Sequence, residues 1–296
     1  MTNRTPTPSP ITPPASSEAA PRWPLWARIL VLPVFMLLAT MSPLVLQFPL
    51  SLIPGVGSYL NSDEGLAWGV VMMTISMLLA PVVAITLVWL LVTKVDGRPL
   101  RDTGLVWTRH SLGMLALGIV VSAAVILPLA ALLQPYTRPL EASSVPVWAV
   151  VIQGLVLGIV LQGFPEELIW RGYMLQTMRN RPVLAVVLSA VFFGALHIVS
   201  VGGQQGFAER LVYVVQAGAF GFAAGALLLL CRSLWVAVGI HAGLHFATTA
   251  ATVLGVSTEG PVLWAAIAAG YIVVGLVALA LRARGEGLQA SVVIDR

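Results

Sequence analysis

Two carboxylates and a guanidinium stand close together in a part of the chain that is otherwise apolar, as Glu166, Glu167 and Arg171. Ionisable groups in a membrane cost roughly 2.5–3.5 kcal/mol each on insertion scales, so this cluster indicates either a functional site or a buried ion pair that joins helices. On a helix, Glu167 and Arg171 share one face and can pair, whereas Glu166 is rotated about 100° away. We therefore predict Glu167 and Arg171 as a structural ion pair and Glu166 as the reactive carboxylate.

Three of the four histidines also lie inside apolar runs, namely His197, His241 and His245. Each alone would more often be a packing residue, but their depths argue for a shared site. Glu166 and His197 flank the basic, helix-breaking turn 179–182 at similar distances, on the order of 20–25 Å at 1.5 Å per residue. His241 and His245 share one face of a later helix, on the order of 13–20 Å from the same surface. The Glu166 carboxylate and the three imidazoles can therefore lie close together.

A carboxylate with imidazoles in a partly desolvated cavity suits the activation of water, which makes hydrolysis the simplest reaction. Glu166 would remove a proton from a water molecule that His197 positions. His241 and His245 could then donate hydrogen bonds to the oxyanion of a tetrahedral intermediate. The same four side chains are also adequate ligands for a divalent metal such as zinc, so the residues leave catalysis without a cofactor and metal-dependent catalysis open. Pro165 is predicted to kink the helix beside Glu166.

The composition places this cluster in a membrane. Of the 296 residues, 58% are hydrophobic and 9% are charged, and the mean hydropathy is +0.93. These values exclude a soluble protein and indicate an all-α, polytopic membrane protein. Runs long enough to cross about 30 Å of hydrocarbon predict about eight transmembrane helices, near 25–48, 66–93, 112–134, 147–178, 183–200, 211–230, 233–254 and 261–281.

The flanking segments complete the predicted organisation. Residues 1–24 are expected to be a disordered tail, 25–282 a transmembrane helical domain and 283–296 a short polar tail. With the N-terminus inside, 14 Lys and Arg residues fall on the cytoplasmic side, and only Arg138 and Arg210 fall outside. This asymmetry predicts that both termini are cytoplasmic. The Ala-, Gly- and Leu-rich chain looks bacterial, so we expect a multi-pass protein of the cell (inner or plasma) membrane.

Two further features concern packing and the loops. The connection 94–111, which carries Asp96 and His110, is expected to be a solvated cytoplasmic loop. Gly218, Gly221 and Gly225 are predicted to form a small-residue face where helices approach closely.

Three motifs, taken together and in order, support a family resemblance. They are Glu-Glu-x-x-x-Arg, Phe-x-x-x-His and His-x-x-x-Asn, and this chain matches them at Glu166, Glu167, Arg171, Phe193, His197 and His241, with His245 in the last position. Over about residues 95–250 the sequence resembles the CPBP intramembrane proteases, also called the Abi or type II CAAX prenyl endopeptidase family. That segment is the predicted core of the membrane domain.

The resemblance implies an eight-helix fold and endoproteolysis of membrane-associated or lipidated peptides or proteins. Family members act in CAAX processing, and relatives are linked to bacteriocin immunity or maturation. It also implies that Glu166 and His197 activate water, that His241 and position 245 form the oxyanion hole, and that Phe193 supports them. His245 departs from the usual asparagine: it retains one hydrogen-bond donor, but a third imidazole keeps a metalloprotease in consideration.

Two other classes of protein remain open. A non-catalytic immunity or scaffold protein of the Abi type would retain the polar cluster for helix packing. A proton-coupled transporter could use the same groups as a relay, but no inverted repeat is evident. The expected partners are the lipid bilayer and a membrane-associated or lipidated substrate, and no nucleic acid.

Overall fold

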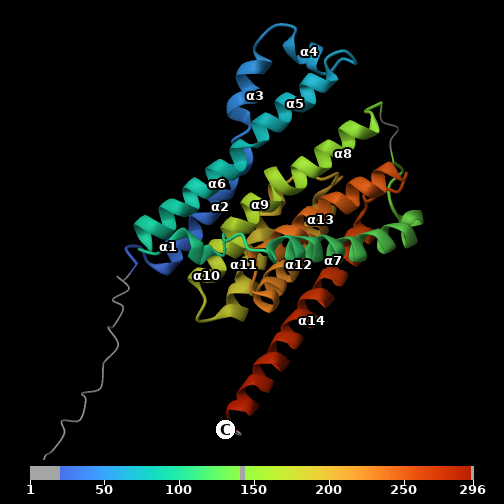
Figure 1. Ribbon diagram of the computed structural model, residues 1–296. Helices are drawn as coiled ribbons and strands as arrows, with labels where there is room; N and C mark the ends of the chain where they lie inside the picture. Colours follow the sequence, from blue (N-terminus) through green and yellow to red (C-terminus); the bar gives the residue numbers. More distant parts are fainter. Residues whose placement is uncertain (1–20, 141–143, 295–296) are drawn as a thin grey trace, which may run out of the picture.

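A computed structural model describes residues 21–140 and 144–294, of which 286–294 are described by their backbone alone. The predicted tail 1–24 lies almost entirely outside these residues. The described chain is helical and contains no strand, so the predicted all-α class is confirmed (Figure 1). In chain order, the helices labelled in Figure 1 are α1 (Leu25–Leu30), α2 (Leu32–Met41), α3 (Leu44–Ser51), α4 (Val56–Leu60), α5 (Leu66–Met77), α6 (Leu79–Leu90), α7 (Ser111–Leu132), α8 (Val147–Val156), α9 (Gly163–Glu167), α10 (Leu175–Thr177), α11 (Pro182–Leu196), α12 (Phe207–Cys231), α13 (Leu234–Val253) and α14 (Pro261–Ile294).

Seven helical stretches among the described residues are long and apolar enough to cross a membrane. They are Leu66–Val95, Ser111–Leu132, Val147–Thr177, Pro182–Val199, Phe207–Cys231, Leu234–Val253 and Pro261–Gly285. The pair Leu25–Met41 and Leu44–Ser51, bent by 43°, brings the number to eight if it forms one span. The multi-pass architecture is therefore confirmed, whereas the side of the membrane on which the termini lie stays a prediction.

Proline explains the bend in the first stretch. Pro43 lies two residues after the end of α2 and has no backbone N–H, so a helix that continued through it would lose a hydrogen bond. The hydroxyl of Ser42 instead donates to the Ala39 carbonyl at 2.7 Å. Beyond the bend, α3 and α4 lead into α5 at an end of the molecule that projects past the other helices (Figure 1).

The centre of the bundle is built around α13 and α12. Helix α13 packs along α7 so closely that a methyl group on Gly239 would overlap the Leu115 carbonyl, and one on Gly118 would overlap the Val236 carbonyl. Helix α12 packs against α11 and α14. The backbone of α14 stays helical to Ile294, so most of the predicted short tail continues the last helix.

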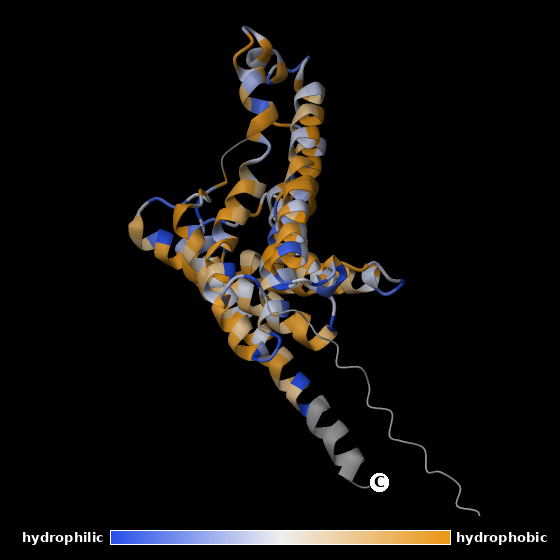
Figure 2. Cartoon of the chain, turned by 90° about the vertical axis from the view of Figure 1, so that its left-hand side faces the viewer, coloured by the Kyte–Doolittle hydropathy of each residue, from blue (hydrophilic) through white to orange (hydrophobic). Residues whose placement is uncertain are grey.

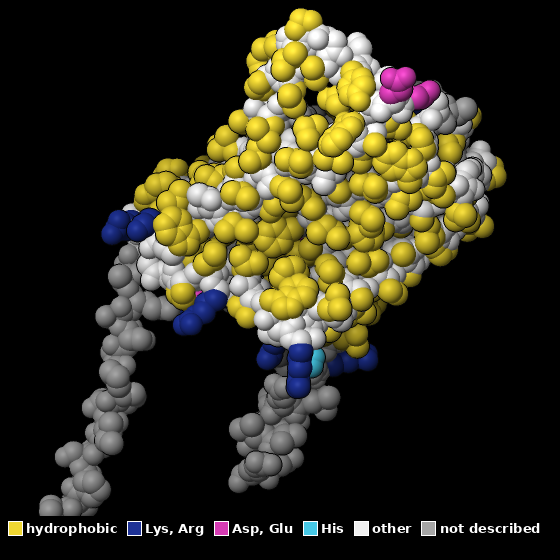
Figure 3. All heavy atoms as spheres, turned by 45° about the horizontal axis from the view of Figure 1, so that its top comes forward, with side chains coloured by type: hydrophobic (Ala, Val, Ile, Leu, Met, Phe, Trp, Pro, Cys, Tyr) yellow, Lys and Arg dark blue, Asp and Glu magenta, His cyan; other side chains and the backbone are white. Residues whose placement is uncertain are grey.

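The surface of the molecule is apolar along its length and charged toward its ends. Figure 2 shows hydrophobic residues along most of each long helix. On the face seen in Figure 3, Lys and Arg side chains lie toward one end and acidic side chains lie at the opposite end. A gathering of Lys and Arg at one end is the pattern that the positive-inside rule describes.

The loop 94–111 differs in one respect from the expected solvated connection. His110 is exposed, but Asp96 is only 4% exposed. Arg28 and Arg98 each place a guanidinium nitrogen 3.0 Å from an Asp96 oxygen, and the Tyr173 hydroxyl donates to it at 3.3 Å. These three donors offset the cost of burying the carboxylate. Asp96 therefore ties α1 to the span that also carries Glu166 and Glu167.

Replacement of Asp96 should destabilise the fold. Asp96→Asn removes the charge that two arginines share, so we expect the free energy of unfolding to fall by about 2 kcal/mol or more. Thermal unfolding in detergent, followed by tryptophan fluorescence, measures this. Asp102→Asn, a matched change at a more accessible position of the same loop, should move the midpoint little. Equal midpoints for the two variants would contradict the assigned role.

Candidate active site

The span Val147–Thr177 carries Glu166 and Glu167 and departs from a regular α-helix on both sides of them. A π-helical turn covers Leu157–Leu161, and a second covers Leu168–Met174. The proline ring would clash with the carbonyl four residues earlier in a regular helix, and the wide turn before Pro165 relieves this clash. Two wide turns thus flank the pair of carboxylates, and the kink at Pro165 stays a prediction. Such turns are frequent at functional sites.

Glu167 is the centre of a buried ionic cluster. Arg171 Nη1 lies 3.1 Å from Glu167 Oε1, and His241 Nδ1 lies 3.0 Å from the same oxygen. Glu167 and Arg171 are fully buried, and His241 is 5% exposed. The Glu167 carboxylate therefore forms the pair with Arg171 that the helical spacing predicts. It also connects its own span to α13 through His241.

Phe193 lies between the members of this cluster. The Arg171 guanidinium lies over its ring at 4.6 Å, and the His197 ring lies 4.6 Å away. The His241 ring contacts it edge-on at 6.3 Å. A buried aromatic face in this place attracts the cation and limits how far either imidazole can move.

His197 caps the end of α11 and begins a short 3₁₀ turn, His197–Val199. Its Nδ1 lies 2.8 Å from the Phe193 carbonyl oxygen. Because a carbonyl can only accept, Nδ1 carries the proton, and Nε2 of the neutral ring is left as an acceptor. The ring lies 6.1 Å from that of Tyr213, an aromatic residue that sequence reasoning did not select.

His241 and His245 lie on one face of α13, as their spacing predicts. Their rings stack 5.5 Å apart at an angle of 14°. The same argument from hydrogen bonding applies to His241, whose Nδ1 donates to Glu167. His245 is more accessible, and no side-chain hydrogen bond of its ring occurs within the described residues.

Glu166 is buried but not paired. It is 2% exposed, and its carboxylate makes no hydrogen bond within the part of the chain that the structure describes. It interacts electrostatically with Glu167, Arg171 and Tyr213. His241 in turn interacts with His197 and with His245, which brings the four sequence-predicted groups into one electrostatic cluster.

Several polar atoms of this cluster have no protein partner among the described residues. They are Oε2 of Glu167 and both Nε and Nη2 of Arg171. Buried polar atoms are normally satisfied by protein or by water, so this cluster is expected to hold water or a polar group of a ligand. An arrangement of this kind can activate water and stabilise negative charge.

The proposed metal ligands do not assemble into a metal site. In the described ranges, no group of three or more His, Cys, Asp or Glu side chains is arranged to hold a metal ion. The parallel rings of His241 and His245 do not converge on one point, and Nδ1 of His241 is committed to Glu167. The donor set of Glu166, His197, His241 and His245 therefore does not fit zinc coordination.

Two arginines that the sequence places on the outer side hold the segment after His197. Arg210 Nη1 donates to the Ile198 carbonyl at 2.7 Å and to the Ser200 carbonyl at 3.3 Å. In the sequence, Arg210 and Arg138 differ from the other basic residues only as exceptions to the charge asymmetry. That exception could have indicated their role, because an arginine on the side of the membrane that has few Lys and Arg residues needs a local partner.

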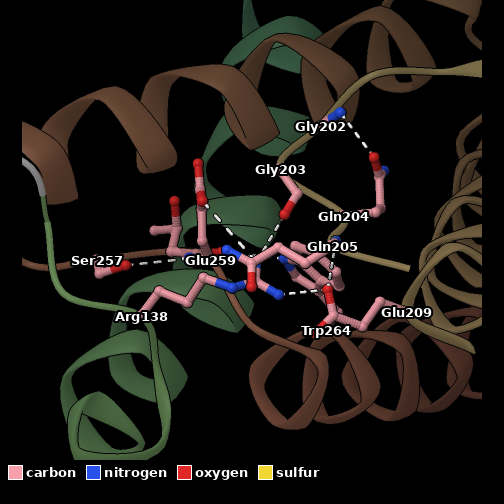
Figure 4. A network of polar contacts seen from close by, with 10 residues as sticks. Arg138, Gly202, Gly203, Gln204, Gln205, Glu209, Ser257, Glu259 and Trp264 are labelled. Atoms are coloured by element: carbon pink, nitrogen blue, oxygen red, sulfur yellow. Dashed lines mark hydrogen bonds and ion pairs between the residues drawn. The ribbon is translucent and has the colours of Figure 1, made fainter.

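Arg138 organises the network of Figure 4. It pairs with Glu209, donates to the Gly203 carbonyl at 2.7 Å, and stacks over Trp264 at 5.5 Å from the ring centre. Glu259 lies 4.0 Å from it. The network joins the end of α7, the loop after His197, the start of α12 and the loop before α14. It therefore fixes the end of the molecule at which His197 lies.

One known family matches the part of the chain that carries the candidate site. The described chain combines several apolar helices of membrane-spanning length with a buried cluster of Glu and His side chains. Residues 144–247 match the family model described as Type II CAAX prenyl endopeptidase Rce1-like. The matched segment contains every candidate site residue, from Glu166 to His245, and it confirms the resemblance carried by the three motifs. A comparison with curated proteins finds no match.

The position of Arg171 depends on the missing side chain of Gly221. A methyl group there would lie 2.5 Å from Arg171 Nη2, and the buried guanidinium cannot retreat because Glu167 and Phe193 hold it. Gly221→Ala should therefore lower the free energy of unfolding by about 1–3 kcal/mol. Unfolding in detergent measures this. In the control Gly113→Ala, no atom lies within 4 Å of the new methyl, so stability should hold or rise slightly. The same result for both variants would show that Arg171 is not confined.

Proposed function

We propose that this chain is an intramembrane endopeptidase that hydrolyses a peptide bond of a membrane-associated or lipidated substrate. One observation carries the proposal. Glu166 is a buried carboxylate without a hydrogen-bond partner in the described residues, beside a second carboxylate that contacts both Arg171 and His241 through Oε1. A structural ion pair needs only one of the two glutamates. The match to a CAAX endopeptidase family over residues 144–247 supports the same activity.

The proposed reaction begins with water bound between Glu166 and His197. Nε2 of His197 accepts a hydrogen bond from this water, because Nδ1 donates to the Phe193 carbonyl. Glu166 removes a proton from the water as the oxygen attacks the carbonyl carbon of the scissile peptide bond. The carbonyl oxygen becomes the oxyanion of a tetrahedral intermediate. When the intermediate collapses, the C–N bond breaks, and the proton held by Glu166 passes to the leaving amine.

His245 and His241 are proposed to stabilise the oxyanion in different ways. A neutral His245 ring has one N–H to donate, and none of its side-chain hydrogen-bonding capacity is used by described residues. His241 already donates from Nδ1 to Glu167, so its Nε2 donates only when the ring carries a second proton. The hydrogen bond from Nδ1 gives Glu167 a part in positioning His241, beyond its pairing with Arg171.

An apolar cavity beside the cluster suits a lipid chain or an apolar substrate segment. It has a volume of about 420 Å³ and lies between α8 and α13, where Val151, Leu155, Phe246 and Ala250 line it. Phe246 directly follows His245, so a group held in this cavity would lie next to the oxyanion-binding end of the site. The size is in the range of small-molecule sites, which is roughly 300–1,000 Å³.

The decisive variant is Glu166→Gln, which keeps the shape of the side chain and removes the base. We expect peptide cleavage to fall by about 10²–10⁴-fold. The measurement compares peptide termini by mass spectrometry in membranes of cells that express the wild-type protein or the variant. Glu64→Gln, the same change at an exposed position, should leave the termini unchanged. Termini that depend on Glu166 would identify the substrate as well as the activity.

The same experiment distinguishes hydrolysis by Glu166 from a non-catalytic role. If wild type and Glu166→Gln are equally abundant and folded but produce identical termini, hydrolysis by Glu166 is wrong. A membrane immunity or scaffold protein of the Abi type then becomes the better assignment.

The cavity between α8 and α13 makes a separate prediction about substrates. Ala250→Trp should fill it and reduce cleavage of a farnesylated peptide by roughly tenfold or more, mainly through KM, with less effect on the unlipidated peptide. Steady-state kinetics on the two peptides in detergent test this. Ala265→Trp, at an exposed position of α14, is the matched control. Equal losses for both peptides would mean that the cavity does not receive the lipid.

A further inference from the structure

A second cavity lies at the basic end of the bundle and shares no residue with the candidate active site. It has a volume of about 470 Å³ and is bounded by the ends of α10 and α12, the starts of α11 and α13, and the α14 segment near Leu281. We propose that this cavity binds the phosphate head group of an anionic phospholipid. The proposal is independent of the proteolytic function.

The charge of the lining is the first argument. Arg179, Arg232 and Arg282 all line the cavity. Arginine recognises phosphate through a planar fork of N–H donors. Basic cavities between membrane helices on the cytoplasmic side are known recognition sites for lipid head groups.

Two helix starts add to this positive field. Helix α11 begins at Pro182 and α13 at Leu234, and both residues line the cavity. The first turn of a helix presents backbone N–H groups without intrahelical partners and the positive end of the helix dipole. In α13 the Ser233 side chain accepts from only one of them, the Trp235 N–H. The remaining donors complement the three arginines.

The backbone of Arg232 is the second, independent argument. Its φ is 53° and its ψ 38°, and it is the only residue other than glycine with positive φ among those that the structure describes. The position caps α12, where the Arg232 N–H donates to the Leu228 carbonyl at 2.8 Å. Glycine adopts this left-handed conformation without the steric cost that a side chain brings. An arginine here implies a use for its guanidinium that offsets this cost.

The depth of the cavity selects a lipid over a soluble anion. Its walls include Leu229 and Leu281, so an apolar surface lies directly beside the arginines. It is formed where membrane spans end, which is the level at which lipid phosphates lie. The Lys and Arg asymmetry predicts that this end faces the cytoplasm, whose leaflet carries anionic lipids.

The test uses Arg232→Gly, which removes the guanidinium and relieves the left-handed strain, so the variant should fold. Native mass spectrometry of the delipidated full chain, titrated with phosphatidylglycerol, measures binding. We expect affinity to fall roughly tenfold in Arg232→Gly and further in the double variant with Arg179→Gln. Arg109→Gln, an exposed arginine outside the cavity, should bind like wild type.

Two additional titrations decide between the sources of phosphate. Phosphatidylcholine should bind the wild-type protein much more weakly than phosphatidylglycerol, because its head group carries no net charge. Inorganic phosphate at millimolar concentration should not displace phosphatidylglycerol. Equal binding of phosphatidylglycerol by wild type and by a folded Arg232→Gly variant would overturn the proposal. Tight binding of inorganic phosphate without phosphatidylglycerol would overturn it in favour of a soluble anion.

Discussion

The rest of the structure depends on the Glu167 carboxylate, which one arginine and one imidazole share at the centre of an apolar bundle. A lone charge in this place would be prohibitively costly, and each partner removes part of that cost only if it arrives with correct geometry. Arg171 reaches it along the same span, but His241 must come from α13. The pairing therefore specifies the rotation of two helices. It leaves Glu166 on a different face, where the described residues show no hydrogen bond from Glu166 to either partner.

Much of this arrangement follows from local periodicity and is therefore readable in the sequence. The apolar runs predict the spans because hydrocarbon thickness sets their length. The spacing of Glu167 and Arg171, and that of His241 and His245, places each pair on one face because helical geometry is nearly constant. Gly221 was predicted as a packing residue, and the structure places Arg171 and Phe193 beside it.

Other features depend on contacts between distant segments and could not be read in the same way. Asp96 looks like an ordinary loop residue, and only the fold brings Arg28 and Tyr173 to it. The hydrogen bond from His241 to Glu167 changes which ring nitrogen is available, and spacing along the chain contains no information about it. Whether four side chains converge as metal ligands is also a property of packing, and spacing along the chain contains no information about it.

The glycine contacts between α7 and α13 have a consequence for the shape of the site. Backbone lies directly on backbone at Gly118 and Gly239, so sliding or rotation of α13 against α7 would create steric overlap almost at once. The side of α13 that carries His241 and His245 is thus a fixed wall. The opposite wall is the irregular span with Glu166, whose wide turns lack regular α-helical bonding. The two walls of the site therefore differ in kind: one is fixed by backbone contact with α7, and the other takes its shape from wide helical turns.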